Sequence, residues 1–456
     1  MDRTINGFLI LLVYLAVAVW LVPFYPNHGG ERELADWATA VSLVERSSTD
    51  ISWASEMTET KFGPDMVESN GAVRSKHSPG LALLAAPIYA ISRFFVGEPN
   101  KGNIHTSWYV LRIVFSVLPL LILAGWLYAQ DVDTYSLAVL LFATPLFPNS
   151  LVFTSGIFSA ALVYVGFRIL WDQRRVSVNN CLNASFLLSL AFLCDYHALP
   201  AFLICGVALF STERIDRFRR VLFFLLGAFP AVLVLLIYNQ IVFGNPFSFV
   251  VFALGDFNSA LVPAAAIRLL GSLFLFSPIL LIAVYALFAS PESGSRRNNL
   301  KIAIIFITAI VAVVFEQDAR ESMIGPQCLL VIAPLLLDCF FDGEIIEYPS
   351  HWRGAFFSFS LLACAMPALT RIYAPAGFVF PQRTYWWPLI YKEHVFANTL
   401  LNTAGYSNTI WTLAPAIALL LLPLWFVWRE ARFPFQSLIG MLVGIGVFAG
   451  LLLAWG

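Results

Sequence analysis

Long apolar runs separated by short polar segments occupy most of the chain. A helix needs about 20 apolar residues to cross the hydrocarbon core of a bilayer, and most of the runs approach that length. The run at 181–211 is too long for one helix and is interrupted at Asp195–Pro200, so it predicts a helical hairpin. Single membrane-spanning helices are predicted near residues 6–24, 81–97, 108–130, 134–150, 152–171, 221–243, 264–290, 302–315, 327–341, 354–372, 410–428 and 437–455.

This pattern predicts an all-α, polytopic membrane protein with about 12–14 transmembrane helices in one membrane-embedded domain, residues 1–456. Composition agrees, because 59% of the residues are hydrophobic and 12% are charged, against about 25% charged in soluble domains. The net charge of -1 and the lack of a long basic patch argue against a nucleic-acid partner. The six cysteines lie in or beside apolar runs without a CxxC pair, which predicts buried thiols.

Arginine and lysine gather in four loops, and the positive-inside rule places such loops in the cytoplasm. The four loops contain Arg174 and Arg175; Arg214, Arg217, Arg219 and Arg220; Arg296, Arg297 and Lys301; and Arg429 and Arg432. The extracytoplasmic face then carries a large first loop, 25–79, with interfacial helices, and an aromatic loop, 373–409. Four predicted spans between the first loop and Arg174 would place Arg174 on the extracytoplasmic face, against the positive-inside rule. One of the segments between 81 and 171 therefore does not cross the membrane completely.

The first extracytoplasmic loop opens with an amphipathic helical pattern, because apolar residues recur at helical spacing from Leu34 to Val44. Glu33 and Asp36 are three residues apart and share one face of this helix, and Glu31 lies near its start. Acids in a first helical turn complement the helix dipole. Alternatively, one of these carboxylates is a general base at the membrane surface, where partial desolvation raises its basicity.

The same loop ends in a basic cluster of Arg74, Lys76 and His77, directly before Pro79 and a new apolar run. The cluster either anchors the chain at the interface or binds the phosphate of a lipid-linked substrate.

Further polar and aromatic candidates lie along the rest of the chain. Asp195 and His197 form the tip of the predicted hairpin, as a polar turn or as a functional pair. Trp386 and Trp387 in the aromatic loop either cover a sugar or acceptor or belong to an interfacial aromatic belt. Ionisable residues within or beside the spans, which either snorkel to the interface or have a function, are Arg112, Asp195, Arg268, Asp338 and Arg371.

The order of several short motifs resembles membrane glycosyltransferases of the GT-C type, which include protein O-mannosyltransferases, the lipid A aminoarabinose transferase and bacterial relatives. The first loop opens with acids on an interfacial helix and closes with Ser75–Gly80, a Ser-Lys-x-x-Pro-Gly element. Tyr238–Asn239 and Phe243–Phe247 resemble a YN…FGNPF stretch, and Phe276–Pro278 and Gly325–Pro326 resemble two later marks. The likeness covers roughly residues 1–340.

The resemblance implies transfer of a sugar from a polyprenyl-phosphate donor on the outer face, with inversion at the sugar and a first-loop acid as base for the acceptor. The candidate catalytic residues, in order of preference, are Glu33, Asp36 and Glu31. The candidates for binding the donor phosphate are Lys76, Arg74, His77 and Arg268. The candidates for binding substrate are Asp195, His197, Tyr238, Asn239, Trp386 and Trp387.

The chain departs from the family pattern in three places. Glu31–Glu33, with Arg32 at its centre, replaces the usual Asp or Asp-Glu. Gln327 stands where relatives often have an arginine, and Gly271 replaces another, although Arg268 lies about one helical turn earlier. Because of these departures, the sequence does not assign the general base to one residue. An inactive or divergent member of the GT-C type remains an alternative.

We therefore expect a multi-pass glycosyltransferase of a bacterial inner membrane. Its expected partners are a polyprenyl-phosphate sugar donor, a lipid or glycan acceptor and membrane lipids. A divalent metal is compatible with this chemistry, but no ligand pattern indicates one. The alternatives are a transporter or lipid flippase, although no repeat pair is visible, and a non-catalytic membrane scaffold.

Overall fold

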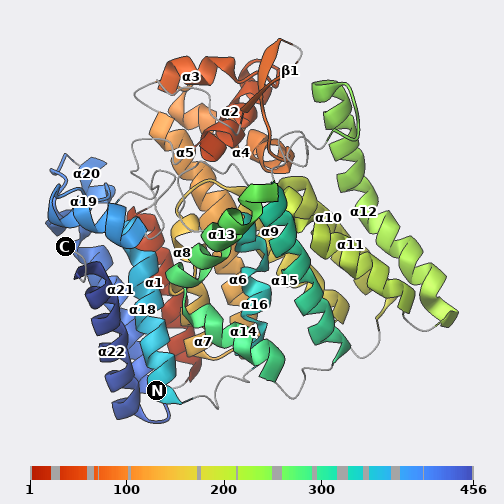
Figure 1. Ribbon diagram of the computed structural model, residues 1–456. Helices are drawn as coiled ribbons and strands as arrows, with labels where there is room; N and C mark the ends of the chain where they lie inside the picture. The colour runs from red at the N-terminus through yellow and green to blue at the C-terminus, as the bar shows by residue number, and fades with distance from the viewer. Residues whose placement is uncertain are drawn as a thin grey trace.

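The computed structural model describes residues 3–21, 31–58, 66–69, 71–100, 104–171, 176–211, 214–248, 259–289, 295–315, 327–342, 349–370, 381–403 and 405–453. Within these ranges the chain is almost entirely helical (Figure 1). Seven helices are long and apolar enough to cross a membrane: α5 to α6 (Thr106–Tyr128), α12 (Arg214–Phe243), α13 with a preceding turn (Ser259–Phe276), α15 (Arg296–Phe315), α18 (Ser350–Leu369), α21 (Ile410–Glu430) and α22 (Pro434–Leu453). Shorter apolar helices are α1 (Arg3–Leu21), α4 (Gly80–Val96), α9 (Ser155–Trp171), α10 (Val178–Cys194), α11 (Leu199–Ala208) and α14 (Ile279–Ala289). The predicted all-helical, polytopic membrane protein is confirmed.

Three predicted spans are broken helices that neighbouring helices shield from lipid. The run 134–150 consists of α7 (Thr134–Phe142) and α8 (Leu146–Asn149), and all of its residues are buried. The run 264–290 breaks at Ser277 between α13 and α14, and the Ser360 hydroxyl accepts a hydrogen bond from the freed Ile279 N–H. Irregular backbone at membrane depth is tolerated where protein supplies the missing hydrogen bonds.

The third broken span, 327–341, consists of three short helical segments. They are a 3-10 helix (Gln327–Ile332), α16 (Ala333–Leu336) and α17 (Asp338–Phe341). Nearly all of it is buried, so none of its irregular backbone faces lipid.

A cap covers one end of the helical bundle, at the top of Figure 1. It consists of α2 (Glu31–Glu45), α3 (Ser52–Thr58), α4 and the antiparallel strands β1 (Met66–Ser69) and β2 (Ala72–Ser75). The cap and the start of α5 share a hydrophobic cluster, in which the Trp37 ring lies 5.1 Å from Trp108 and 5.6 Å from Trp53. The sequence pattern predicts interfacial helices in this loop but not the strand pair.

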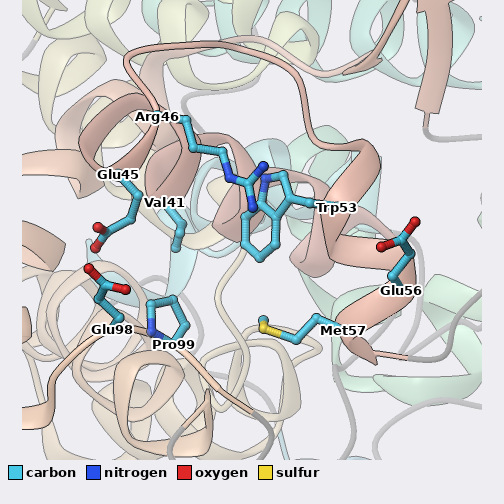
Figure 2. Close-up of a pocket in the computed structure, with 8 residues that line it drawn as sticks. All are labelled: Val41, Glu45, Arg46, Trp53, Glu56, Met57, Glu98 and Pro99. Atoms are coloured by element: carbon cyan, nitrogen blue, oxygen red, sulfur yellow. The ribbon is translucent and has the colours of Figure 1, made fainter.

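The predicted span at 81–97 is wrong, because α4 does not cross the bundle. It runs beside α2, and both helices begin and end within the cap (Figure 1). At the end of α2, Glu45 accepts a hydrogen bond of 2.8 Å from the Tyr89 hydroxyl and forms an ion pair of 2.8 Å with Arg93. The chain that follows α4 stays at this level, since Glu98 lies beside Glu45 in the same pocket (Figure 2).

Placing α4 in the cap removes the inconsistency in the predicted topology. The next helix begins at the cap, where Trp37 donates a hydrogen bond to Ser107, and ends at Tyr128, which packs on Gly7 near the start of α1 at the opposite end. The chain returns through α7 and α8 to Ser155 beside the cap, and α9 descends again. Three crossings instead of four then separate the first loop from the first arginine-rich loop.

The described arginine-rich segments lie together at the end of the bundle opposite the cap. Arg296 begins α15 beside the end of α11, and α21 ends at Glu430, which accepts a hydrogen bond from Asn6 near the start of α1. Residues 172–175 lie outside the described part of the chain. This common location is what the positive-inside rule requires, and a cytoplasmic position for this end remains a prediction.

Asp338 stabilises that end of the bundle, so the snorkelling alternative is wrong for this residue. Its carboxylate is completely buried and accepts hydrogen bonds from Tyr164 (2.7 Å), Arg168 (2.8 Å), Arg297 (2.6 Å) and Lys301 (2.7 Å). A buried charge needs such partners, and here they join α9, α15 and α17.

None of the six cysteines forms a disulfide, and all six are buried.

Candidate active site

Glu33 forms a buried ion pair at the start of α2. Its Oε1 and Oε2 accept hydrogen bonds of 2.7 Å and 2.9 Å from Nε and Nη2 of Arg112 on α5 (Ile104–Arg112). Oε1 also accepts a hydrogen bond of 2.8 Å from the backbone N–H of Phe153. Both charged side chains are 0% exposed. This bidentate geometry joins α2, α5 and the chain before α9.

Arg32, the preceding residue, forms a second buried ion pair on another face of α2. Its guanidinium lies 3.0 Å from the Asp195 carboxylate and donates a hydrogen bond of 2.6 Å to the Ser155 hydroxyl. Asp195 also accepts hydrogen bonds from the backbone N–H of His197 (3.0 Å) and from its Nδ1 (2.9 Å). Arg32 thus ties α2 to the tip of the α10–α11 hairpin.

Asp195 is ionised in this environment. Burial alone would raise the pKa of its carboxyl, but the charge of Arg32 and the hydrogen bonds from His197 outweigh burial and hold the pKa well below its usual value. Asp195 also caps the 3-10 turn Tyr196–Ala198, so the polar turn predicted at the tip of the hairpin is present.

The Ser75–Gly80 element packs directly on this hairpin tip. The Ser78 hydroxyl donates hydrogen bonds to the carbonyl oxygens of Phe192 and Leu193. Gly80 begins α4 so close to the hairpin that a Cβ atom there would lie 2.4 Å from the Leu193 oxygen. Only glycine permits this contact, which explains the Pro-Gly ending of the motif and places the basic cluster beside the hairpin.

Asp36 lies one helical turn beyond Glu33 and is 2% exposed. Its charge acts on the Cys194 thiol and on the Tyr238 hydroxyl of α12. Arg74 on β2 also acts electrostatically on Tyr238. The charges of Asp36 and Arg74 therefore both reach Tyr238, although the sequence separates the three residues widely.

The basic cluster presents its three side chains differently. Arg74 donates hydrogen bonds to Thr49 and to the Ser69 carbonyl, and the backbone N–H of His77 donates one to Ser75. Lys76 is half-buried and makes no ion pair or hydrogen bond with the part of the chain that the structure describes. Its ammonium group is the one in this cluster that is not engaged by those residues.

Other predicted site residues lie elsewhere or serve the fold. Asn239 is fully buried and donates a hydrogen bond of 3.2 Å to the Pro246 carbonyl, so it holds the chain after α12. Trp386 is fully buried in the hydrophobic core, 5.5 Å from Phe276, and is not placed to cover a sugar. Trp387 begins α19 (Trp387–Tyr391), on the far side of the bundle from α10 and α12 (Figure 1). The described helix of the aromatic loop, α19, is thus separate from the α10–α11 hairpin and from α12 (Figure 1).

Three further residues singled out in the sequence add little to this geometry. Arg268 lies half-buried on α13. The side chain of Glu31 lies outside the described part of the structure, as does Arg371.

Sequence reasoning identified Arg112 only as an ionisable residue in an apolar run, and it treated Arg32 only as a departure from a motif. Their partners Glu33 and Asp195 lie 79 and 163 residues away in the chain. Sequence alone did not join them, because the pairing depends on tertiary contacts.

A pocket of about 520 Å³ lies in the cap at the far end of α2 (Figure 2). The Arg46 guanidinium lies over the Trp53 ring, 5.1 Å from its centroid, at one side of the pocket. The lining residues are Val41, Glu45, Arg46, Trp53, Glu56, Met57, Glu98 and Pro99. Val41 is five residues beyond Asp36, so the pocket begins about 7.5 Å along α2 from Asp36.

The described residues contain no group of three or more His, Cys, Asp or Glu side chains arranged to hold a metal ion.

No protein-family model matches the chain, and no curated protein matches it in sequence. Its structure is similar to ArnT from Cupriavidus metallidurans in the apo state, with a TM-score of 0.50 and 14% identity over 96% of this chain and 76% of that chain. It is also similar to the same protein bound to undecaprenyl phosphate, with a TM-score of 0.54 and 14% identity over 98% of this chain and 76% of that chain. The resemblance to the GT-C type is therefore confirmed for the fold, and the chain is a multi-pass membrane protein with the fold of ArnT.

Proposed function

We propose that the protein is a membrane glycosyltransferase that transfers a sugar from a polyprenyl-phosphate-linked donor to an acceptor at the outer face of a bacterial inner membrane. The observation that carries this proposal is that α2, which bears Asp36, and the Ser-Lys-x-x-Pro-Gly element both pack on the tip of the α10–α11 hairpin, through the contacts Arg32–Asp195 and Ser78–Leu193. The fold supports it, since one of the similar ArnT structures holds undecaprenyl phosphate.

In this proposal Asp36, rather than Glu33, is the general base. Both oxygens of Glu33 already accept hydrogen bonds from Arg112. Asp36 is on the same helix, one turn further on, and its charge acts on Tyr238, as does that of Arg74. It would accept the proton of the acceptor hydroxyl as that oxygen bonds to the anomeric carbon of the donor sugar.

The bond between the anomeric carbon and the phosphate oxygen breaks in the same step, and polyprenyl phosphate leaves with the electron pair. Lys76 is proposed to bind that phosphate, with Arg74 and His77 beside it and Arg268 as a further candidate. A polyprenyl tail fixes its phosphate near headgroup depth, and the Ser-Lys-x-x-Pro-Gly element lies at the cap end of the bundle, where Ser78 and Gly80 pack on the tip of the α10–α11 hairpin. Charge-assisted hydrogen bonds from a cation at that depth stabilise the leaving group.

The cap pocket is proposed to bind a part of the acceptor that is remote from the reacting hydroxyl. Its carboxylates, Arg46 and Trp53 offer hydrogen-bonding groups and a ring to a polar, hydroxyl-rich molecule. Contacts so far from the chemistry would affect acceptor affinity more than the rate of transfer.

Binding and turnover test the proposal separately. Undecaprenyl phosphate should raise the melting temperature of the purified protein, whereas undecaprenol, which lacks the phosphate, should not. Equal shifts with both compounds, or none with either, would contradict the donor site. In membranes supplying donor and acceptor, Asp36→Asn should slow sugar transfer by about 10²–10⁴ with the melting temperature unchanged.

Phosphate-dependent binding without any turnover would instead favour a flippase or a scaffold. Unchanged transfer in Asp36→Asn would remove Asp36 as the base.

A further inference from the structure

A groove of about 830 Å³ lies between α11 and the first turns of α15, at the end of the bundle opposite the cap. Its walls are apolar, and the polar residues on its rim are Arg296 and Asn299. The groove is lined by Leu203, Ile204, Val207, Ala208, Phe210, Arg296, Asn299 and Leu300.

The apolar side chains of this groove face outward from the bundle. Leu203, Val207 and Phe210 are 51%, 67% and 57% exposed. They belong to α11 and the turn that follows it, which form one arm of a hairpin in the apolar part of the chain. In a protein that crosses a bilayer, such side chains lie at the level of the lipid, so hydrocarbon chains are the natural occupant of the groove.

The rim of the groove carries positive charge at the depth where α15 enters the bundle. The Arg296 guanidinium lies 4.7 Å from the centroid of the Trp171 ring and donates a hydrogen bond to the Ala208 carbonyl at the end of α11. These contacts hold the guanidinium beside the mouth of the groove. Arginine fixed in this way suits a phosphate group, because its planar N–H donors match phosphate oxygens.

The charges around Arg296 favour an anion further. In the described part of the chain, the adjacent network contains the cations Arg168, Arg297 and Lys301 and the carboxylates Asp338 and Asp342. Those three cations exceed the two carboxylates by one charge, and Arg296 adds another. A basic pocket between transmembrane helices on the cytoplasmic side typically binds the headgroup of an anionic lipid.

We propose that this groove binds an anionic phospholipid, with its acyl chains along α11 and α15 and its phosphate beside Arg296. The occupant differs from the polyprenyl-phosphate donor, since the groove lies at the opposite end of the bundle from Lys76. The inference is independent of the proposed transferase activity. It stands on the apolar walls, on Arg296 at the rim and on the surplus of positive charge in the adjacent network.

Thermal unfolding in detergent with added lipid tests this site. Phosphatidylglycerol should raise the melting temperature of the wild-type protein more than phosphatidylcholine with the same acyl chains, and inorganic phosphate should have no effect. Arg296→Gln should weaken the apparent affinity for phosphatidylglycerol about fivefold, which corresponds to about 1 kcal/mol for one cation near an anionic headgroup. Each variant is compared with its own lipid-free melting temperature, so a loss of basal stability does not hide the effect.

Arg219→Gln is the matched control, because Arg219 is exposed at the same end on α12 and does not line the groove. It should keep the wild-type response to phosphatidylglycerol. Val207→Trp should fill the groove and reduce the response without removing a charge. Equal responses of the wild type to the two phospholipids, an equal loss in Arg219→Gln, or no change in Val207→Trp would overturn the proposal.

Discussion

Replacing Glu33 by glutamine should destabilise the protein, which separates a positioning role from a catalytic one. The substitution keeps the shape of the side chain and an oxygen for the Phe153 N–H, but it removes the charge that faces Arg112. It also places amide N–H donors against the guanidinium donors. Because both side chains are 0% exposed, Arg112 loses the carboxylate that compensates its charge in a buried environment.

Breaking a buried ion pair in this way costs about 3–5 kcal/mol, against a total stability of about 5–15 kcal/mol for typical domains. Glu33→Gln should therefore lower the melting temperature and the yield of folded protein. The double variant Glu33→Leu with Arg112→Met removes both charges and should recover much of the stability. Tryptophan fluorescence is a suitable assay, because the Arg112 guanidinium lies 5.6 Å from the centroid of the Trp108 ring.

Transfer activity completes the experiment. If Glu33 only positions α2, the double variant should regain part of the activity together with the stability. The reasoning is refuted if Glu33→Gln unfolds at the wild-type temperature while transfer falls by about 10²–10⁴, since that result identifies Glu33 as the base.

Three further predictions concern the cap. Lys76→Ala should remove the melting-temperature shift caused by undecaprenyl phosphate with little change in the lipid-free melting temperature, and an undiminished shift would exclude Lys76 from the donor site. Gly80→Ala should cost about 1–3 kcal/mol of stability, measured by thermal unfolding, because its Cβ would lie 2.4 Å from the Leu193 oxygen; Gly125→Ala, with nothing within 4 Å, is the control. Trp53→Ala should raise KM for the acceptor with a nearly constant kcat, and an unchanged KM would remove the cap pocket from acceptor binding.

The reassigned position of α4 has a consequence for topology. With α4 in the cap, all the described arginine-rich segments lie at the other end of the bundle, as the positive-inside rule expects. The helix was misread because its apolar content matches a span. Its exposed Phe94 and Phe95, which are 88% and 87% exposed, suit the membrane interface as well as its interior.

By itself, the sequence determined the class of the protein and the residues worth considering. Apolar runs long enough to span a bilayer specify a helical membrane protein, because a helix satisfies all its backbone hydrogen bonds internally where lipid offers none. The helical spacing after Leu34 specified the amphipathic α2 and placed Glu33 and Asp36 on one face. The Pro79-Gly80 pair marked the start of α4, although only the structure showed which peptide the glycine must approach.

Tertiary structure alone decided which of these residues are paired with one another. Glu33 and Asp36 share one helical face in the sequence pattern, yet the arginine that pairs with Glu33 lies 79 residues away, and the charge of Asp36 acts on Tyr238 of a distant helix. Likewise, the apolar residues of α4 pack against α2, whereas the same composition elsewhere crosses the bundle. Hydrophobicity and helical period are local properties, but burial, charge pairing and the direction of a helix depend on contacts between segments far apart in the chain.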